Sequence, residues 1–271
     1  MKELFARIAV ALVGIPLLVF IIFKGGLYFG IFFGLVALLG QWEIYKILNA
    51  KSVRPQMIPG MFLTILLLAI VMNYQQQWLK ILIMLVFLYI FASEMYRNNG
   101  SSNLNIAGTF YGLIYPVGFL GTLIYLRLYL SNVFSDNQAA LFILTVFVAI
   151  WTCDTMAYFV GSLIGRHRLF VRVSPKKSIE GAVAGVVGAS VIFLIVYRMQ
   201  FIPISLHIAL VSAGIIGIFG QLGDLVESWF KRDAGIKDSS RIIPGHGGIL
   251  DRFDSVMFVS PFFLIMFLLW N

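Results

Sequence analysis

The chain has 271 residues, a formal net charge of +8 and a mean hydropathy of +0.94; 60% of its residues are hydrophobic and only 12% are charged. Soluble domains carry about a quarter charged residues, so this composition excludes a water-soluble protein and predicts a polytopic membrane protein. The single cysteine, Cys153, excludes an internal disulfide and a zinc site made of cysteines.

Apolar runs of membrane length recur along the whole chain. A helix needs about 20 apolar residues to cross the ~30 Å hydrocarbon layer, and runs that are continuous rather than alternating disfavour a β-barrel. We therefore predict an all-α integral membrane protein with about nine transmembrane helices, at roughly Ile8–Phe23, Leu27–Tyr45, Pro59–Asn73, Leu79–Ser93, Gly108–Leu130, Ala139–Gly161, Gly181–Tyr197, Ile204–Phe230 and Phe253–Trp270.

The basic residues predict how these helices are oriented. With the N-terminus in the cytoplasm, 16 of the 20 Lys and Arg residues fall in cytoplasmic segments, and only Lys24, Lys80, Arg127 and Arg198 do not. Cytoplasmic loops are enriched in Lys and Arg, so we predict a cytoplasmic N-terminus and an external C-terminus. No small-x-small cleavage site follows the first apolar run, which is therefore predicted to be an uncleaved helix.

Acidic residues are concentrated in the second half of the chain. Eight of the twelve lie between Asp154 and Asp254, at or near the predicted cytoplasmic face. Residues 1–135, with about five spans, are accordingly predicted to form an N-terminal membrane scaffold. Residues 136–271 are predicted to form a C-terminal catalytic membrane domain, with about four spans and cytoplasmic loops at 162–180 and 231–252.

Three of these acids lie inside predicted helices. Asp154 is about two turns inside the sixth span, and Asp224 and Glu227 lie near the cytoplasmic end of the eighth, on one helix face because of their i, i+3 spacing. A carboxylate at membrane depth must be paired, hydrated or bound to a cation. A salt bridge to a neighbouring helix is the alternative, but no basic residue is expected at matching depth for all three acids.

The predicted loop at 162–180 is strongly basic. Five Lys and Arg residues lie within twelve positions, and Ser174 and Pro175 directly precede the last two of them, Lys176 and Lys177. Ser178 is a predicted N-cap of the following helix, whose free N–H groups would favour phosphate. A solvated loop that only anchors the topology is the alternative interpretation.

The stretch Ser228–Asp254, SWFKRDAGIKDSSRIIPGHGGILDRFD, is a polar island between two apolar runs. Its glycine-rich turn can bring backbone amides against an anion, and His246 in that turn can donate to a phosphate or carry a proton. Interleaved acids and bases suit a polyphosphate held through a divalent cation, with carboxylates on the metal and Lys and Arg on the phosphates. Ordinary surface salt bridges are the alternative.

Several common sites are absent from the sequence. It contains no P-loop, GxGxxG, HExxH, CxxC or GxSxG motif. Nucleic-acid binding is not expected either, because the basic residues are scattered among membrane loops without a soluble domain to present them.

The polar stretch resembles the signature of the phosphatidate cytidylyltransferases (CDP-diacylglycerol synthases). All of the defined positions of that signature are matched, at Ser228, Phe230, Lys231, Arg232, Lys237, Asp238, Ser240, Ile243, Pro244, His246, Gly247, Gly248, Ile249, Asp251, Arg252, Phe253 and Asp254. The segments Asp154–Gly161, Ser174–Gly181 and Gly223–Ser228 are also similar to that family, so the resemblance covers roughly residues 150 to 255.

The resemblance implies a nucleotidyltransferase of phospholipid biosynthesis that joins CTP and phosphatidic acid into CDP-diacylglycerol and pyrophosphate. It implies a requirement for Mg2+, with a second cation left open, and a multi-pass protein of the inner cell membrane with its active site on the cytoplasmic face. Asp224 and Asp251 are the expected metal ligands, with Asp154, Glu227 and Asp254 as further candidates. The expected catalytic residues are Asp224, Asp251, Lys231 and His246, and the expected substrate-binding residues are Ser174, Lys176, Lys177, Arg232, Lys237, Gly247, Gly248 and Arg252.

Two other functions remain open on the sequence. One is a CTP-dependent polyprenol or phytol kinase, which would transfer the γ-phosphate instead of the cytidylyl group. The other is a transporter of phosphorylated solutes, although no inverted repeat is visible in the sequence. The glycine-rich segment Gly181–Gly188 would allow close helix packing or a homodimer interface.

Overall fold

The computed structural model describes residues 2–72, 77–240, 242–243 and 247–270, with the side chains of residues 2–9 and 79 left out. Its helices are α1 (Lys2–Lys24), α2 (Gly26–Ala50), α3 (Met57–Val71), α4 (Gln77–Arg97), α5 (Ser102–Gly112), α6 (Phe119–Val133), α7 (Asp136–Ile164), α8 (Ile179–Met199), α9 (Leu206–Ile215), α10 (Gln221–Asp233) and α11 (Leu250–Trp270). The π-helical turns η1 (Leu113–Gly118) and η2 (Ile216–Gly220) join α5 to α6 and α9 to α10. Strands β1 (Arg168–Phe170) and β2 (Ser174–Ser178) form an antiparallel hairpin.

The all-α prediction is confirmed, and each predicted span falls on a helical segment. The fifth and eighth predicted spans correspond to the composite helices α5–η1–α6 and α9–η2–α10. By length and composition, six helices of the described residues can cross a membrane: Gly26–Ala50, Ser102–Val133, Asp136–Ile164, Ile179–Met199, Leu206–Asp233 and Leu250–Trp270. Val10–Lys24 and Met57–Val71 are apolar but shorter.

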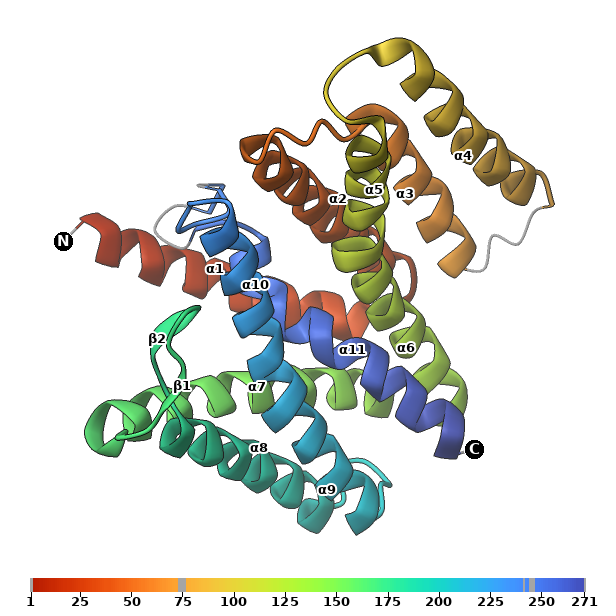
Figure 1. Cartoon of the computed structure of the whole chain (residues 1–271). Coiled ribbons are helices and arrows are strands. Elements are labelled where there is room, and N and C mark those ends of the chain that lie inside the picture. Colours follow the sequence, from red (N-terminus) through yellow and green to blue (C-terminus); the bar gives the residue numbers. More distant parts are fainter. Residues whose placement is uncertain (1, 73–76, 241, 244–246, 271) are drawn as a thin grey trace.

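The first and second halves of the chain pack against each other (Figure 1). In this view α3 and α4 lie at one end and α7, α8 and α9 at the other, while α10 and α11 run between them. Most of the core is one apolar cluster that includes Phe29 and Phe33 of α2, Phe142 of α7 and Phe263 of α11. Because the two halves share one core, the predicted division at residue 135 stays a prediction about which half carries the active site.

Glycines allow α7 and α8 to approach each other closely. A Cβ at Gly181 would lie 2.6 Å from the carbonyl oxygen of Ala157, and one at Gly185 would lie 2.8 Å from the Sγ of Cys153. Side chains at these positions would push the helices apart. The glycines of α8 thus pack against α7 of the same chain and are not free for the dimer interface that the sequence allowed. Cys153 is buried here as a small apolar side chain.

Local capping sets where the polar elements begin. The Oγ of Ser178 accepts a hydrogen bond from the N–H of Gly181, which confirms Ser178 as the N-cap of α8. The hairpin is tied to the same helix start by Glu180, whose Oε1 lies 2.6 Å from Nδ1 of His167. These contacts hold the basic hairpin beside the ends of α7 and α8.

Candidate active site

The π-turn η2 lies directly before α10, the helix that carries two of the five predicted acids, Asp224 and Glu227. Gln221, the first residue of α10, donates from Nε2 to the carbonyl oxygens of Gly217 (2.6 Å) and Ala182 (3.0 Å), and so fixes the start of α10 against α8. In α10, Asp224, Glu227 and Lys231 follow at i, i+3 and i+7, which places them along one face. Single-turn π-bulges are frequent at functional sites, and this one sets which face of α10 points inward.

That face lines a polar cavity of about 790 Å³. Asp154 comes from α7, Asp224, Glu227 and Lys231 from α10, and Asp251, Arg252 and Asp254 from α11, while the hairpin contributes Arg168, Lys176 and Lys177. The structure therefore brings together acids and bases from segments up to 100 residues apart in the sequence. The segments around Asp154, Lys176–Lys177 and Asp224–Asp254, which the sequence analysis singled out, thus lie around one cavity.

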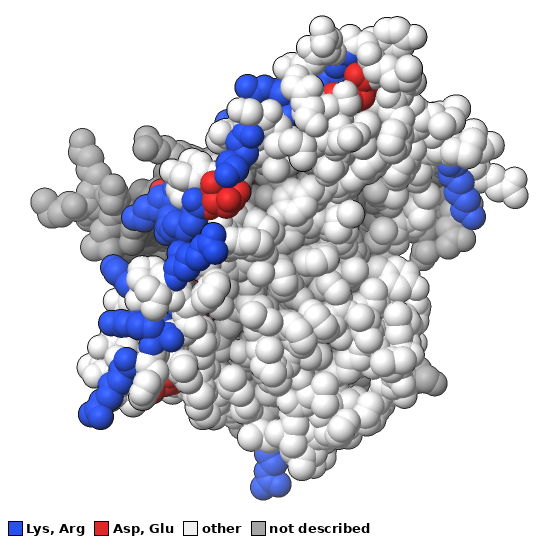
Figure 2. Space-filling model, viewed as in Figure 1, with Lys and Arg blue, Asp and Glu red and all other residues white. Residues whose placement is uncertain are grey.

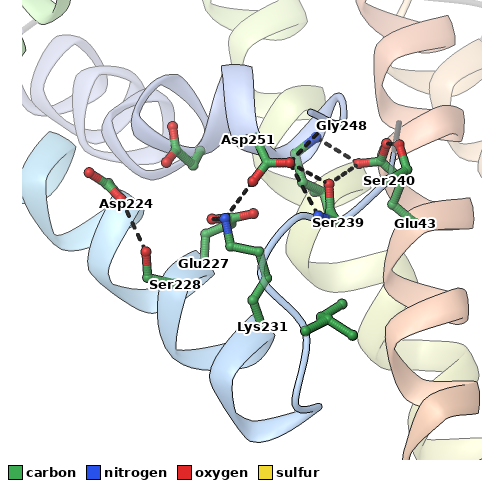
Figure 3. Close-up of polar contacts among 12 residues, drawn as sticks. Glu43, Asp224, Glu227, Ser228, Lys231, Ser239, Ser240, Gly248 and Asp251 are labelled. Carbon is green, nitrogen blue, oxygen red and sulfur yellow. Dashed lines mark hydrogen bonds and ion pairs between the residues drawn. The ribbon is translucent and has the colours of Figure 1, made fainter. Parts of the chain in front are cut away.

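Two lysines in this cavity are paired with its acids. Lys177 of the hairpin forms an ion pair with Asp224. Lys231 forms one with Asp251 and another with Glu227, whose Oε2 lies 2.5 Å from its Nζ (Figure 3). The expectation of no basic residue at matching depth was wrong for Glu227 and Asp224, because Lys231 is one turn away from Glu227 on the same helix and Lys177 of the hairpin reaches Asp224. Asp154 takes part in none of the ion pairs of the described residues.

The two lysines do not satisfy every carboxylate oxygen of the cavity. Oε1 of Glu227 is buried without a hydrogen-bond partner among the described residues. A buried carboxylate oxygen without a donor is costly, so it fits a cation or water that approaches from the cavity. Over the described part of the chain, however, no three His, Cys, Asp or Glu side chains are arranged as a metal site. Five carboxylates line the cavity, but they do not converge on one point as they stand.

Asp251 has a defined set of donors. Its Oδ1 pairs with Lys231, and its Oδ2 accepts from the backbone N–H groups of Gly248 (2.7 Å) and Ser239 (3.2 Å). Gly247 has a φ of +81°, and a Cβ on it would lie 2.8 Å from Oδ2 of Asp251. The Gly247–Gly248 pair therefore shapes the pocket around this carboxylate; its expected contact with phosphate stays a prediction.

Other predicted residues lie apart from the cavity lining. Arg232 is exposed and donates to the carbonyl oxygen of Ile236, and Lys237 is exposed on the loop after α10. Ser174 is the first residue of β2 and is half-buried. His246 lies outside the described residues. Of the predicted binding residues, Lys176, Lys177 and Arg252 line the cavity.

Glu43, which the sequence analysis did not single out, contacts the loop between α10 and α11. Glu43 of α2 is fully buried and accepts hydrogen bonds from Ser239 and Ser240 (Figure 3). The signal available in the sequence was weak: an acid at the predicted cytoplasmic end of a span, in a half of the chain that has few acids.

An apolar groove adjoins the polar cavity. It measures about 510 Å³ and is lined by the hairpin residues Leu169 and Phe170, by Val183 and Val186 of α8, and by Leu222 and Trp229 of α10, among others. Leu169, Ala182 and Gln221 line both spaces, so the groove and the cavity are neighbours. The site can thus accommodate a ligand with a charged end and an apolar end.

Comparison with known proteins gives a match over nearly the whole chain. The model of a family described as "Cytidylyltransferase family" matches residues 5–270. A protein of Staphylococcus saprophyticus named phosphatidate cytidylyltransferase is 36% identical over 261 residues, which cover 93% of this chain and 95% of that protein. A protein of Staphylococcus aureus (strain COL) with the same name is 35% identical over 260 residues, with the same coverage.

Proposed function

The chain belongs to the cytidylyltransferase family, and from that premise we propose that it transfers the CMP group of CTP to phosphatidic acid, giving CDP-diacylglycerol and pyrophosphate. The observation that carries the assignment is a charged cavity directly beside an apolar groove. Phosphatidic acid has the same division, with a phosphate at one end and acyl chains at the other. Neither alternative function is favoured by a feature of the site or by the relatives.

In this reaction an oxygen of the lipid phosphate attacks the α-phosphorus of CTP, and the bond to the β-phosphate breaks so that pyrophosphate leaves. Both reactants are anionic, so the site must align them and neutralise their charge. Lys176, Lys177, Lys231 and Arg252 line the cavity and are suited to bind the phosphates. Phosphate oxygens can replace Asp224 and Asp251 as acceptors for Lys177 and Lys231. No covalent intermediate with the protein is required.

A divalent cation, Mg2+ as expected from the family, would be held by Asp224 and Asp251, with Asp154, Glu227 and Asp254 as further ligands or supporting residues. The fit rests on the carboxylates that line the cavity and on the unpartnered Oε1 of Glu227. Carboxylate oxygens are the preferred protein ligands of this ion. When bound, the cation would neutralise charge on the phosphates that react and leave.

The membrane topology that belongs to this proposal has nine crossings, a cytoplasmic N-terminus and an external C-terminus. Figure 2 supports a single charged side, because on the face it shows most Lys and Arg side chains gather along one edge. Figure 1 shows the hairpin and the loop after α10 at that edge. CTP would reach the cavity from the cytoplasm and phosphatidic acid from the inner leaflet of the cell membrane.

Product analysis tests the proposed reaction. The purified protein in detergent, given Mg2+, phosphatidic acid and CTP labelled at the α-phosphate, is expected to transfer the label to the lipid. CTP labelled at the γ-phosphate is expected to leave all its label in water-soluble pyrophosphate. Label from the γ-position in the lipid would instead identify a kinase, and no labelled lipid from either substrate would refute the proposal.

The apolar groove gives a separate prediction about the acyl chains. Val183 of α8 lines the groove and is 59% exposed, so Val183→Trp fills the groove without disturbing the core. Turnover of a long-chain phosphatidic acid is expected to fall about tenfold, while a six-carbon analogue reacts at nearly the wild-type rate. The matched control is Val191→Trp, two turns further along α8, 48% exposed and not among the residues lining the groove. Equal losses with both lipids, or in both variants, would contradict the assignment.

A further inference from the structure

Helix α2 places a carboxylate in the interior beside the loop that joins α10 to α11. Glu43 has no exposed surface, and none of the described Lys or Arg residues forms an ion pair with it. A buried charge of this kind is stable only where hydrogen bonds replace its water. The groups that donate hydrogen bonds to Glu43 therefore indicate which part of the structure its carboxylate stabilises.

Four donors from one loop surround both carboxylate oxygens of Glu43. Oε1 accepts from the Oγ of Ser240 (2.5 Å) and the N–H of Ile249 (2.9 Å), and Oε2 accepts from the Oγ of Ser239 (2.9 Å) and the N–H of Leu250 (2.8 Å). One side chain of α2 thus joins Ser239 and Ser240, in the middle of the segment between α10 and α11, to the start of α11 (Figure 3). It also serves the first turn of α11 as an N-terminal cap, where negative charge is favoured.

The same loop residues hold Asp251. The Oγ of Ser239 lies 2.9 Å from Oε2 of Glu43 and also 2.9 Å from Oδ2 of Asp251, so one hydroxyl lies between the two carboxylates. Gly248 donates its N–H to Asp251, and a Cβ at Gly248 would lie only 1.9 Å from that hydroxyl and 2.5 Å from Oε1 of Glu43. The absence of a side chain at residue 248 is thus required by the approach of Glu43 to the loop.

We propose that Glu43 is a positioning residue for the transfer reaction, acting through Ser239 and the Gly248–Leu250 backbone to fix the place of Asp251. The inference rests on the proposed function for its kinetic consequence. It gives the N-terminal half a direct part in the site, since α2 and α11 together set where the Asp251 carboxylate points. Glu43 itself is not among the described residues that line the cavity.

Glu43→Gln is the informative variant, because the amide has nearly the shape of the carboxylate. One backbone N–H faces each oxygen of Glu43, so whichever way the amide turns, its NH2 group opposes a donor. Glu94→Gln is the matched control: Glu94 is 3% exposed in α4, and it accepts from Gln56, Asn105 and Arg97, away from the loop. Both variants lose hydrogen bonds of a buried carboxylate, so both are expected to unfold at a lower temperature than wild type.

The two variants are expected to differ in function. CTP-dependent turnover per folded molecule should fall about 10- to 100-fold in Glu43→Gln and stay within twofold of wild type in Glu94→Gln. Amide hydrogen exchange in the peptide containing Gly248–Leu250 should become at least about tenfold faster in Glu43→Gln only, because the N–H of either Ile249 or Leu250 then faces an NH2 group instead of an acceptor. If Glu43→Gln does not fold, Ser239→Ala removes the shared hydroxyl and should give the same pattern with a smaller loss, about tenfold.

The outcomes separate the two proposals. Turnover within twofold of wild type in Glu43→Gln, or equal losses in Glu43→Gln and Glu94→Gln, would overturn the positioning role. Unchanged exchange at Gly248–Leu250 would do the same without any activity measurement. A wild-type protein that transfers no cytidylyl group would refute the proposed function, while the exchange result would still decide whether Glu43 holds the loop.

Discussion

Replacing Asp251 by asparagine is expected to lower CTP-dependent turnover at least about 100-fold while the chain remains folded in detergent. Asparagine can keep an oxygen toward the N–H groups of Gly248 and Ser239, so the loop retains its shape. The NH2 group of the asparagine then points at the ammonium group of Lys231, so that two donors oppose each other. The negative charge that would hold a cation is also lost. Asp224→Asn is expected to behave in the same way, because Asp224 is the other proposed ligand.

Asp233→Asn is the matched control for this prediction. Asp233 is on the same polar segment, at the end of α10, but it is exposed and pairs at the surface with Lys51. Surface ion pairs contribute about 0–1 kcal/mol to stability, so the unfolding temperature and the turnover of this variant should be close to those of wild type. Measured rates at saturating CTP and Mg2+ check the comparison. Full activity in Asp224→Asn and Asp251→Asn would contradict the assignment of both as metal ligands.

Lys231→Met is expected to have the largest effect on stability. The ammonium group of Lys231 lies between Glu227 and Asp251, and all three side chains are at most 10% exposed. Removing it leaves two buried carboxylates without their cation, which costs about 3–5 kcal/mol in buried pairs. The same change removes a proposed phosphate ligand, so turnover should also fall by about 100-fold or more.

A second substitution separates these two effects. Glu227→Gln added to Lys231→Met removes one of the two orphaned charges, and the double variant should regain thermal stability toward that of wild type. Its turnover should stay low, because no cation is restored for the phosphates. Thermal unfolding in detergent and CTP turnover, measured on the same preparations, check both halves. Recovery of turnover together with stability would show that Lys231 only neutralises Glu227 and Asp251.

Sequence patterns predicted the helical segments well, because apolar runs of membrane length leave the backbone little alternative to a helix. The position of Cys153 and the cap at Ser178 also follow from local sequence. The gathering of Asp154, Asp224, Asp251 and the lysine pair was predicted from the polar motifs, since each is attached to a helix end on one predicted side.

Other features depend on contacts that no local pattern contains. The π-turn η2 arises where α10 is held against α8 through Gln221, and its sequence IGIFG gives no sign of it. Glu43 and Ser239 are 196 residues apart, so the local sequence around Glu43 cannot indicate its partner. The pairing of Lys177 with Asp224 required the hairpin to fold back over α10, whereas the sequence predicted only a basic loop.

The most direct test of the site is the position of a bound cation. A crystal of the protein soaked with CTP and Mn2+, an ion with a measurable anomalous signal that can replace Mg2+, is expected to give an anomalous peak in the polar cavity. Carboxylate oxygens of Asp224 and Asp251 should be its protein ligands, with phosphate oxygens of CTP completing its shell. A peak that neither Asp224 nor Asp251 touches, with CTP bound outside the cavity, would contradict the proposed site.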